Sequence, residues 1–342
     1  MGMDFRSDTL TKPTAAMREA MARAEVGDDV FDEDPTVHAL QDEVASLFGK
    51  EAALFVASGT MANVAAVLAQ TSPGTEVICE EGCHIFQYEA GSAAAFSGVQ
   101  LRTIDAPRGH MRWDEIEARI RPDDIHDPPT VLVCLENTHN RAGGTIYPAD
   151  VWAEIARGAH ARDLRVHVDG ARIWNAAVAS GVSLREIAGP VDTLSVCLSK
   201  GLGAPAGSLI VGDRDFIARA RRWRKRLGGG MRQVGILAAA GLHALAHHRE
   251  RLQDDHDHAQ ILARAWADVP GASIDPGAVD TNIVIVEVAG MKASDSEIEA
   301  ALGARDVRLL GMGARRLRMV THLDVSRDDC EQAAAVIREL FA

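Results

Sequence analysis

The sequence predicts an α/β protein whose large domain holds a mostly parallel sheet, followed by a smaller α+β domain. Between about residues 50 and 212, short apolar runs alternate with helical stretches, which is typical of parallel strands joined by covering helices. Beyond about residue 246, short strands and helices of a separate unit follow. We therefore expect a large domain over residues 1–245 and a small C-terminal domain over residues 246–342.

Seven apolar runs have the length and composition of buried strands. They are Ala53–Val56, Glu76–Cys79, Gln100–Ile104, Thr130–Leu135, Arg165–Val168, Thr193–Cys197 and Ser208–Val211. Helices are predicted over Ala62–Gln70, Trp113–Ile120 and Ala149–Asp163, and over most of residues 214–262, with a break at the triple glycine 228–230. The C-terminal region shows strand patterns over Thr281–Val288, Val307–Leu309 and Arg316–Val320, and helical patterns over Asp295–Leu302 and Arg327–Phe341. In such a sheet, ligands bind beyond the carboxyl ends of the strands.

Composition excludes several classes of protein. With 342 residues and 47% hydrophobic content, the chain can bury a large core. A net charge of −13 disfavours a nucleic-acid partner, which needs a basic surface. The apolar runs are too short to span a bilayer and none resembles a signal peptide. For that reason we expect no membrane partner. Because the five cysteines are scattered without a CxxC pair, we also expect a reduced, cytoplasmic protein.

Two short motifs after neighbouring strands indicate pyridoxal phosphate (PLP). In the segment 167–172, Asp169 would keep the pyridine nitrogen protonated, and Arg172 would reach the phenolate oxygen. In the segment 199–203, Lys200 would form the Schiff base with the cofactor aldehyde. Taken singly, these residues could be a solvated ion pair and a surface lysine. The small residues around Lys200 favour the cofactor, because they let a ring approach the backbone.

Other residues would complete such a site, although each has a simpler explanation. Ser58, Gly59 and Thr60 open a helix after a strand, which suits a phosphate but is also an ordinary N-cap. His84 follows another strand and could stack on the ring or act as a base, whereas a lone loop histidine is usually structural. Arg318, within a strand pattern, could clamp a substrate carboxylate.

Three polar segments remain open to two interpretations. The Arg6–Thr9 segment, which contains Ser7, reads by default as a helix cap. The basic segment 223–233 is either a solvated helix face or an anion site for a neighbouring subunit. A histidine-rich segment, from His243 to His258, could suggest a metal-dependent enzyme, but it lacks the glutamate of an HExxH motif, and we assign no metal ligand.

Together these motifs closely resemble the low-specificity L-threonine aldolases, a branch of the fold type I, aspartate-aminotransferase-like PLP enzymes. The resemblance runs nearly end to end. Its segments are residues 6–9, 27–36, 58–63, 84 with 89–91, 135–140, 167–176, 197–209, 223–233 and 318–326. It implies a large domain with a seven-stranded sheet and PLP-dependent retro-aldol cleavage of L-threonine, L-allo-threonine and similar amino acids to glycine and an aldehyde.

The resemblance also assigns roles to individual residues. Cofactor-binding residues would be Lys200, Asp169, Arg172, His84, Ser58, Gly59 and Thr60, with Arg232 and Lys225 from a second subunit. Substrate-binding residues would be Ser7, Arg172, Arg318, His126 and Tyr88. Lys200, His84 and His126 would be catalytic, with His84 or a water it positions as the base that takes the β-hydroxyl proton. A homotetramer, built as a dimer of dimers with its sites at the dimer interface, is implied as well.

Alternatives stay open at this stage. Other PLP reactions on the same fold, such as β-elimination, decarboxylation or transamination, would use much of the same set of residues. A metal-dependent enzyme and a PLP-binding module without activity are more distant alternatives. The sequence does not decide between threonine and allo-threonine, although Tyr88 resembles members that favour the allo form.

Overall fold

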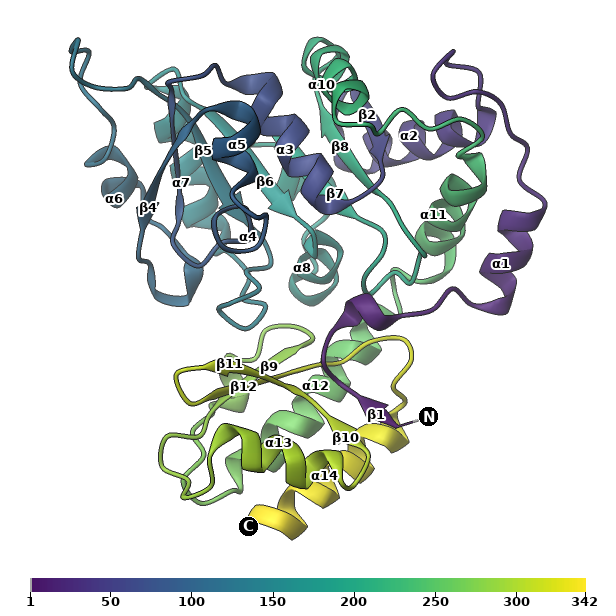
Figure 1. The fold of residues 1–342 in the computed structure, drawn as a ribbon, viewed down its shortest axis with the longest axis vertical. Helices are drawn as coiled ribbons and strands as arrows, with labels where there is room; N and C mark the ends of the chain where they lie inside the picture. Colours follow the sequence, from purple (N-terminus) through teal and green to yellow (C-terminus); the bar gives the residue numbers. More distant parts are fainter. Residues whose placement is uncertain (1) are drawn as a thin grey trace.

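The computed structural model describes residues 2–342, in which a large α/β domain packs on a small α+β domain (Figure 1). The large sheet has seven strands. Their spatial order is β2 (Ala52–Val56), β8 (Ser208–Gly212), β7 (Thr193–Cys197), β6 (Arg165–Gly170), β5 (Thr130–Glu136), β3 (Glu76–Glu80) and β4 (Gln100–Ile104). Only β8 runs antiparallel to its neighbours, which confirms the predicted mostly parallel sheet.

Helices cover both faces of this sheet. They are α1 (Ala15–Ala22), α2 (Pro35–Phe48), α3 (Gly59–Gln70), α4 (His84–Gln87), α5 (Ser92–Ser97), α6 (Trp113–Glu117), α7 (Ala149–His160), α8 (Ile173–Ser180), α9 (Leu184–Ala188), α10 (Arg214–Arg226) and α11 (Gly235–His247). Strand β2 shows how alternation builds the layers, since successive side chains of a strand point to opposite faces. Leu54 and Val56 pack with α3 and α10, whereas Phe55 packs into the main core with α2.

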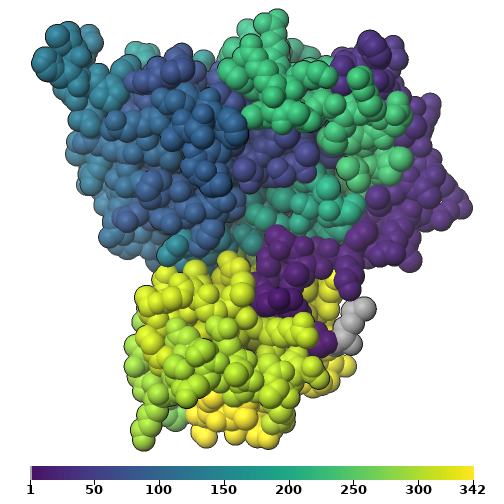
Figure 2. Space-filling model, viewed as in Figure 1, coloured from purple at the N-terminus to yellow at the C-terminus, as the bar shows by residue number. Residues whose placement is uncertain are grey.

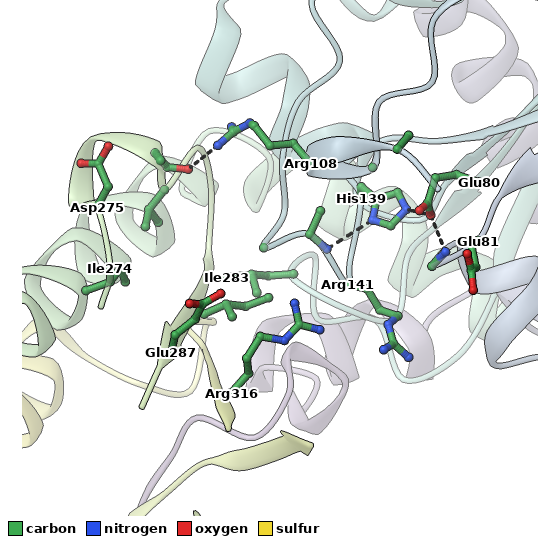
Figure 3. A pocket seen from close by; sticks show the side chains of 18 of the residues that line it. Glu80, Glu81, Arg108, His139, Arg141, Ile274, Asp275, Ile283, Glu287 and Arg316 are labelled. Atoms are coloured by element: carbon green, nitrogen blue, oxygen red, sulfur yellow. Dashed lines mark hydrogen bonds and ion pairs between the residues drawn. The ribbon is translucent and has the colours of Figure 1, made fainter. Parts of the chain in front are cut away.

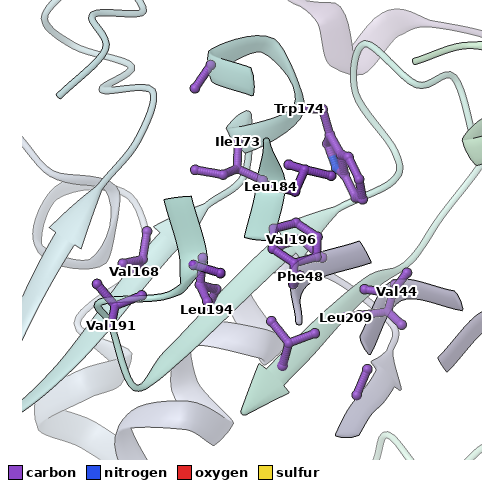
Figure 4. Packing of buried hydrophobic residues seen from close by; sticks show 14 of the residues in the cluster. Val44, Phe48, Val168, Ile173, Trp174, Leu184, Val191, Leu194, Val196 and Leu209 are labelled. Carbon is purple, nitrogen blue, oxygen red and sulfur yellow. The ribbon is translucent and has the colours of Figure 1, made fainter. Parts of the chain in front are cut away.

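The main core lies between the sheet and the helices α2, α7, α8 and α9. In Figure 4, Phe48 of α2 and Trp174 of α8 meet within this core. Their ring centroids are 5.3 Å apart in an edge-to-face arrangement. Aliphatic side chains from β7 and β8, Val196 and Leu209, fill the space around the two rings. This packing holds the carboxyl ends of the central strands in place.

The small domain packs a three-stranded antiparallel sheet against helices. Its elements are α12 (Leu252–Ala267), β9 (Ile283–Glu287), α13 (Asp295–Gly303), β10 (Val307–Arg308), β11 (Leu310–Gly313), β12 (Arg316–Val320) and α14 (Arg327–Phe341), and its sheet order is β11-β12-β9. The N-terminal strand β1 (Met3–Asp4) pairs with β10, and Phe5 is buried in the small-domain core. Residues 3–5 therefore pack with the small domain. The division at residue 246 itself stays a prediction.

Strand β11 is a local difference from the prediction, whereas the cap expected within residues 6–9 is present at Ser7. Strand β11 was not expected, because its glycine-rich residues carry no apolar alternation. The 3-10 turn Asp8–Leu10, capped by Ser7, leads the chain from the small domain into the large one. Within residues 2–342, no helix has both the length and the apolar character needed to cross a membrane.

Candidate functional site

Three parallel strands of the large sheet end next to one cavity. His84 follows β3, Asp169 ends β6, and Lys200 follows β7 by three residues. The cavity has a volume of about 390 Å³, within the range of small-molecule sites. Its lining residues are Ser7, Thr9, His84, Tyr88, Asn140, Arg172, Lys200, Leu310, Gly311, Met312 and Arg318. Six residues that we predicted from the sequence therefore meet here, and the small domain supplies one wall through β11 and β12.

Asp169 lies behind this cavity as a buried carboxylate. Its Oδ1 accepts a hydrogen bond of 3.0 Å from the backbone N–H of Ala171, and its Oδ2 accepts one of 2.7 Å from Asn63. Burial alone would raise the pKa of Asp169, but the charges of His84 and Lys200 and these hydrogen bonds hold it below its usual value. The carboxylate is thus ionised at neutral pH and fits a protonated ring nitrogen.

Asn63 links this carboxylate to a second one. Its Nδ2 donates to both Asp169 and Glu89, the latter at 2.8 Å. Its Oδ1 accepts from the Ser195 hydroxyl at 2.7 Å and lies 3.2 Å from Nε2 of His167. Because both ends of the amide are engaged, its orientation is determined. The sequence analysis assigned Asn63 no role, although a polar residue within the apolar helix α3 was a usable signal.

Glu89 holds the imidazole of His84. Nδ1 of His84 lies 3.0 Å from Oε1 of Glu89, which is buried. Burial would lower the pKa of His84, but the hydrogen bond to Glu89 and the charge of Asp169 raise it overall. Since a carboxylate accepts, Nδ1 is the protonated nitrogen, and Nε2 keeps a lone pair for the cavity. The sequence analysis gave Glu89 no role.

These three groups also invite a test for a metal. Among residues 2–342, His84, Glu89 and Asp169 form the one set of three potential ligands with atoms within 4.8 Å of one another. The Asn63 amide directs its N–H donors at both carboxylates, where a cation would instead require acceptors. The set therefore reads as a hydrogen-bonded network.

Two guanidinium groups converge on the cavity. Arg172 donates from Nε and Nη2 to the buried Asp8, both at 2.7 Å, which leaves Nη1 for a ligand. Although burial opposes it, this arginine lowers the pKa of Asp8 to about 2. Arg318 donates to Asn140 at 2.9 Å and to the carbonyl of Arg6 at 3.2 Å. Its buried Nε has no hydrogen-bond partner among the residues that the structure describes. A buried donor without a partner is expected where a ligand anion binds.

The start of helix α3 offers an anion site nearby. The Ser58 hydroxyl caps the helix, accepting a hydrogen bond of 3.2 Å from the N–H of Met61. The interpretation of Ser58 as an N-cap is therefore confirmed. The N–H groups of the first helical turn, at Gly59 and Thr60, have no acceptor within the helix. The Ser208 hydroxyl, near Gly59, is buried and has no partner within residues 2–342. These donors fit the phosphate of PLP.

Besides Asp169 and the start of α3, three further predicted residues are not part of the cavity lining: Lys225, Arg232 and His126. Lys225 on α10 is exposed, and Arg232, in the loop that follows, is exposed and pairs with Asp28 at 3.1 Å. His126 lies on an irregular segment with its side chain 77% exposed, beside Asp124. This segment forms the protrusion at the upper left of Figure 2, where Ile125 is 96% exposed. None of residues 118–129 is among the described residues that line the cavity.

The histidine-rich segment does not assemble a ligand set. His243 and His247 stack with ring centroids 4.5 Å apart, but His248 turns inward and contacts the carbonyl of Leu202 at 2.7 Å. His256 is buried beside Asn175, and burial lowers its pKa to about 4. His248 and His256 are therefore packed inside the protein, whereas His243 and His247 contact each other along helix α11.

A second cavity, of about 630 Å³, lies beside the first between the two domains (Figure 3). At its edge the buried His139 and Glu80 form an ion pair of 2.7 Å. Arg108 pairs with Asp280 at 2.7 Å, and Arg141 and Arg316 also line the cavity. None of the described residues that line this cavity is a lysine, so they offer no group for covalent attachment like that of the first cavity.

Comparisons with known proteins agree with this geometry. The family model of the beta-eliminating lyases matches residues 4–290. The low specificity L-threonine aldolase of Escherichia coli (strain K12) is 47% identical, over 99% of each chain. Low-specificity L-threonine aldolase 1 of Arabidopsis thaliana is 41% identical, over 96% of this chain and 93% of that protein. The solved structure of Leishmania major threonine aldolase shares the fold, with a TM-score of 0.84 at 20% identity over 99% of this chain and 100% of that one.

Proposed function

The chain belongs to the low-specificity L-threonine aldolases, within the beta-eliminating lyase family, and we propose that it cleaves L-threonine and L-allo-threonine to glycine and acetaldehyde with PLP as cofactor. One observation carries the proposal most directly. A lysine and two arginines with donors left for a ligand line one cavity, and a buried, ionised aspartate lies behind it, as a PLP enzyme acting on an amino acid requires.

Several residues would hold the cofactor. Lys200 would bind it covalently, Asp169 would face its ring nitrogen, and the start of α3 would receive its phosphate. When bound, PLP supplies an electron sink for the bond that breaks at Cα. The Asn63 amide keeps the Asp169 carboxylate in one orientation, so its charge stays directed at the ring position.

The substrate carboxylate would be bound by Nη1 of Arg172 and Nε of Arg318, with Ser7 at the same wall. This fixes the amino acid at one end and orients its Cα–Cβ bond. The Nε2 atom of His84 then takes the β-hydroxyl proton, directly or through water, while Glu89 holds the opposite nitrogen. The Cα–Cβ bond breaks as the aldehyde C=O forms, and Cα afterwards gains a proton to give glycine.

We further propose that the active enzyme is a homotetramer, a dimer of dimers, whose sites lie at the dimer interface. Lys225 and Arg232 of one subunit would reach the phosphate of another, and His126 would join the substrate hydroxyl in the same way. The exposure of all three side chains in one chain is what this assembly would account for. All five cysteines are free, which is consistent with the reducing cytoplasm and a role in glycine formation there.

A product assay tests the proposal. The purified protein, supplied with PLP, is incubated with L-threonine and L-allo-threonine, and glycine and acetaldehyde are quantified. Equal amounts of glycine and acetaldehyde are expected, together with a visible absorbance band that shifts on adding substrate. Formation of 2-oxobutanoate with ammonia would instead identify β-elimination, and a 2-oxo acid without ammonia would identify transamination. Either result would replace the aldolase assignment.

A further inference from the structure

One arginine stands between the catalytic cavity and the second cavity. Asn140, in the loop after β5, lines the first, and its neighbour Arg141 lines the second, where Figure 3 labels it at the edge of the cavity. Nη1 of Arg141 lies 3.4 Å from the Tyr88 hydroxyl, and its Cζ lies 6.0 Å from the Tyr88 ring centroid. Tyr88 itself lines the catalytic cavity. Arg141 therefore sits directly behind one wall of the site.

The charge of Arg141 is not neutralised. No carboxylate of residues 2–342 lies within 4.0 Å of it, whereas Arg108, in the same cavity, is paired with Asp280 at 2.7 Å. Arg141 is half-buried, which reduces competition from water for an anion that reaches it. A half-buried arginine without an acidic partner is a ready donor for an anion.

The second cavity is also lined by acidic side chains, but none of them lies within 4.0 Å of a side-chain nitrogen of Arg141; they are Glu80, Glu81, Asp105, Asp275 and Glu287. Glu80 is already engaged by His139 and by the N–H of Gly82. Arg316 of β12 also lacks an acidic partner within residues 2–342, but Glu287 is its neighbour across the strand pair and offsets part of its charge. Arg141 is thus the stronger anion donor of the two.

The β-substituent of a bound substrate would extend toward Arg141. With its carboxylate at Arg172 and Arg318, the amino acid places its β-carbon beside His84. The Tyr88 ring is the next group outward, with its centroid 5.6 Å from that of His84, and Arg141 follows Tyr88. A β-substituent about one aromatic ring long would extend past Tyr88 and end near the guanidinium.

We propose that this site takes β-hydroxy-α-amino acids whose β-substituent ends in a carboxylate, and that Arg141 binds that carboxylate as a specificity-determining residue. This inference rests on the proposed aldolase function. The reaction stays balanced without any further reactant: the β-hydroxyl loses its proton, the Cα–Cβ bond breaks, a carboxylated aldehyde leaves, and Cα gains a proton to form glycine.

The test compares three substrates on the PLP-loaded enzyme: 3-(4-carboxyphenyl)serine, uncharged 3-phenylserine and L-allo-threonine. Release of 4-carboxybenzaldehyde, benzaldehyde and acetaldehyde gives kcat/KM for each. The wild-type protein is expected to favour the carboxylated substrate over phenylserine by about 10- to 100-fold, the effect of one hydrogen bond to a charged group. Arg141→Gln should remove this preference, Arg141→Lys should restore part of it, and the distant Arg305→Gln should preserve it.

The outcomes separate the two proposals. Absence of aldehyde from all three substrates, L-allo-threonine included, would count against the aldolase function itself. Cleavage of L-allo-threonine without a preference for the carboxylated substrate, or with a preference that survives Arg141→Gln, would overturn the role of Arg141 alone. A preference that also falls as salt concentration rises supports the ionic contact.

Discussion

The two sides of the catalytic cavity differ in how many of the expected site residues a single chain brings to them. On the ring-nitrogen side, Asp169, Asn63, Glu89 and His84 satisfy one another through buried hydrogen bonds of 2.7–3.0 Å. On the phosphate side, the start of α3 offers backbone donors, but the basic side chains expected there are exposed. The comparison teaches that the charged groups expected around the ring are brought together within one fold, whereas the basic side chains expected at the phosphate are not, so that only the proposed assembly would supply them from a second copy of the chain.

Replacing Lys200 should have the largest effect on activity of the changes considered. Lys200→Ala is expected to lower kcat about 10⁴-fold or more, because the covalent attachment of the cofactor is lost. The measurement is acetaldehyde release together with the visible absorbance band, which should disappear. Lys292→Ala, at an exposed position, is the matched control. Substantial turnover by Lys200→Ala would show that the cofactor is held elsewhere.

The buried pair Asp8–Arg172 should dominate stability. Asp8→Asn leaves the Arg172 guanidinium buried without its countercharge, which typically lowers the free energy of unfolding by about 3–5 kcal/mol. Because the folded-state pKa of Asp8 is about 2, below its unfolded value, this stabilisation is present at neutral pH and is lost as pH falls through that value.

Urea unfolding of the wild type and of Asp8→Asn, followed by circular dichroism, measures the effect. The exposed Asp114→Asn serves as control and should change the unfolding free energy by less than about 0.5 kcal/mol. Equal unfolding curves for all three proteins would contradict a structural role for the pair.

The Glu89–His84 contact should govern pH dependence. The base form of His84 is active, so activity falls as pH drops through its raised pKa. Glu89→Gln removes the negative acceptor, lowers the pKa of His84, and should move the acid limb of the kcat/KM profile to lower pH by about one unit. At neutral pH the weaker base should also slow turnover several-fold. Glu81→Gln is the control, and an unmoved limb would mean that Glu89 acts through packing alone.

The smallest effect is expected on the open side of the site. Arg232→Gln should weaken PLP binding about tenfold, through loss of one charged hydrogen bond, with kcat nearly unchanged at saturating PLP. Equilibrium dialysis measures the affinity for PLP, and size-exclusion chromatography establishes whether the wild type and the variant have the same oligomeric state. Arg305→Gln provides the same change of charge on the small domain, far from the site. Unchanged affinity for PLP would indicate that the start of α3 binds the phosphate without Arg232.

Much of the fold was predictable because its signals are local. Apolar runs of strand length marked all seven strands of the large sheet, and the motifs at their carboxyl ends located Asp169, Lys200 and His84 at one edge. The two-residue pairing of β1 with β10 and the glycine-rich β11 escaped prediction, because such short segments carry no periodic pattern.

The sequence by itself therefore determined the layered fold, the strand ends and the identities of the reactive side chains. Only the tertiary structure decided which side chains contact one another. Asn63 donates hydrogen bonds to Asp169 and Glu89. Asp8 pairs with Arg172, and Arg141 lies beside the Tyr88 hydroxyl. The physical reason is sequence distance. Asp8 and Arg172 lie 164 positions apart, and Asn63 and Asp169 lie 106 apart. Contacts of this kind form only when packing brings separate elements together, and no local propensity encodes them.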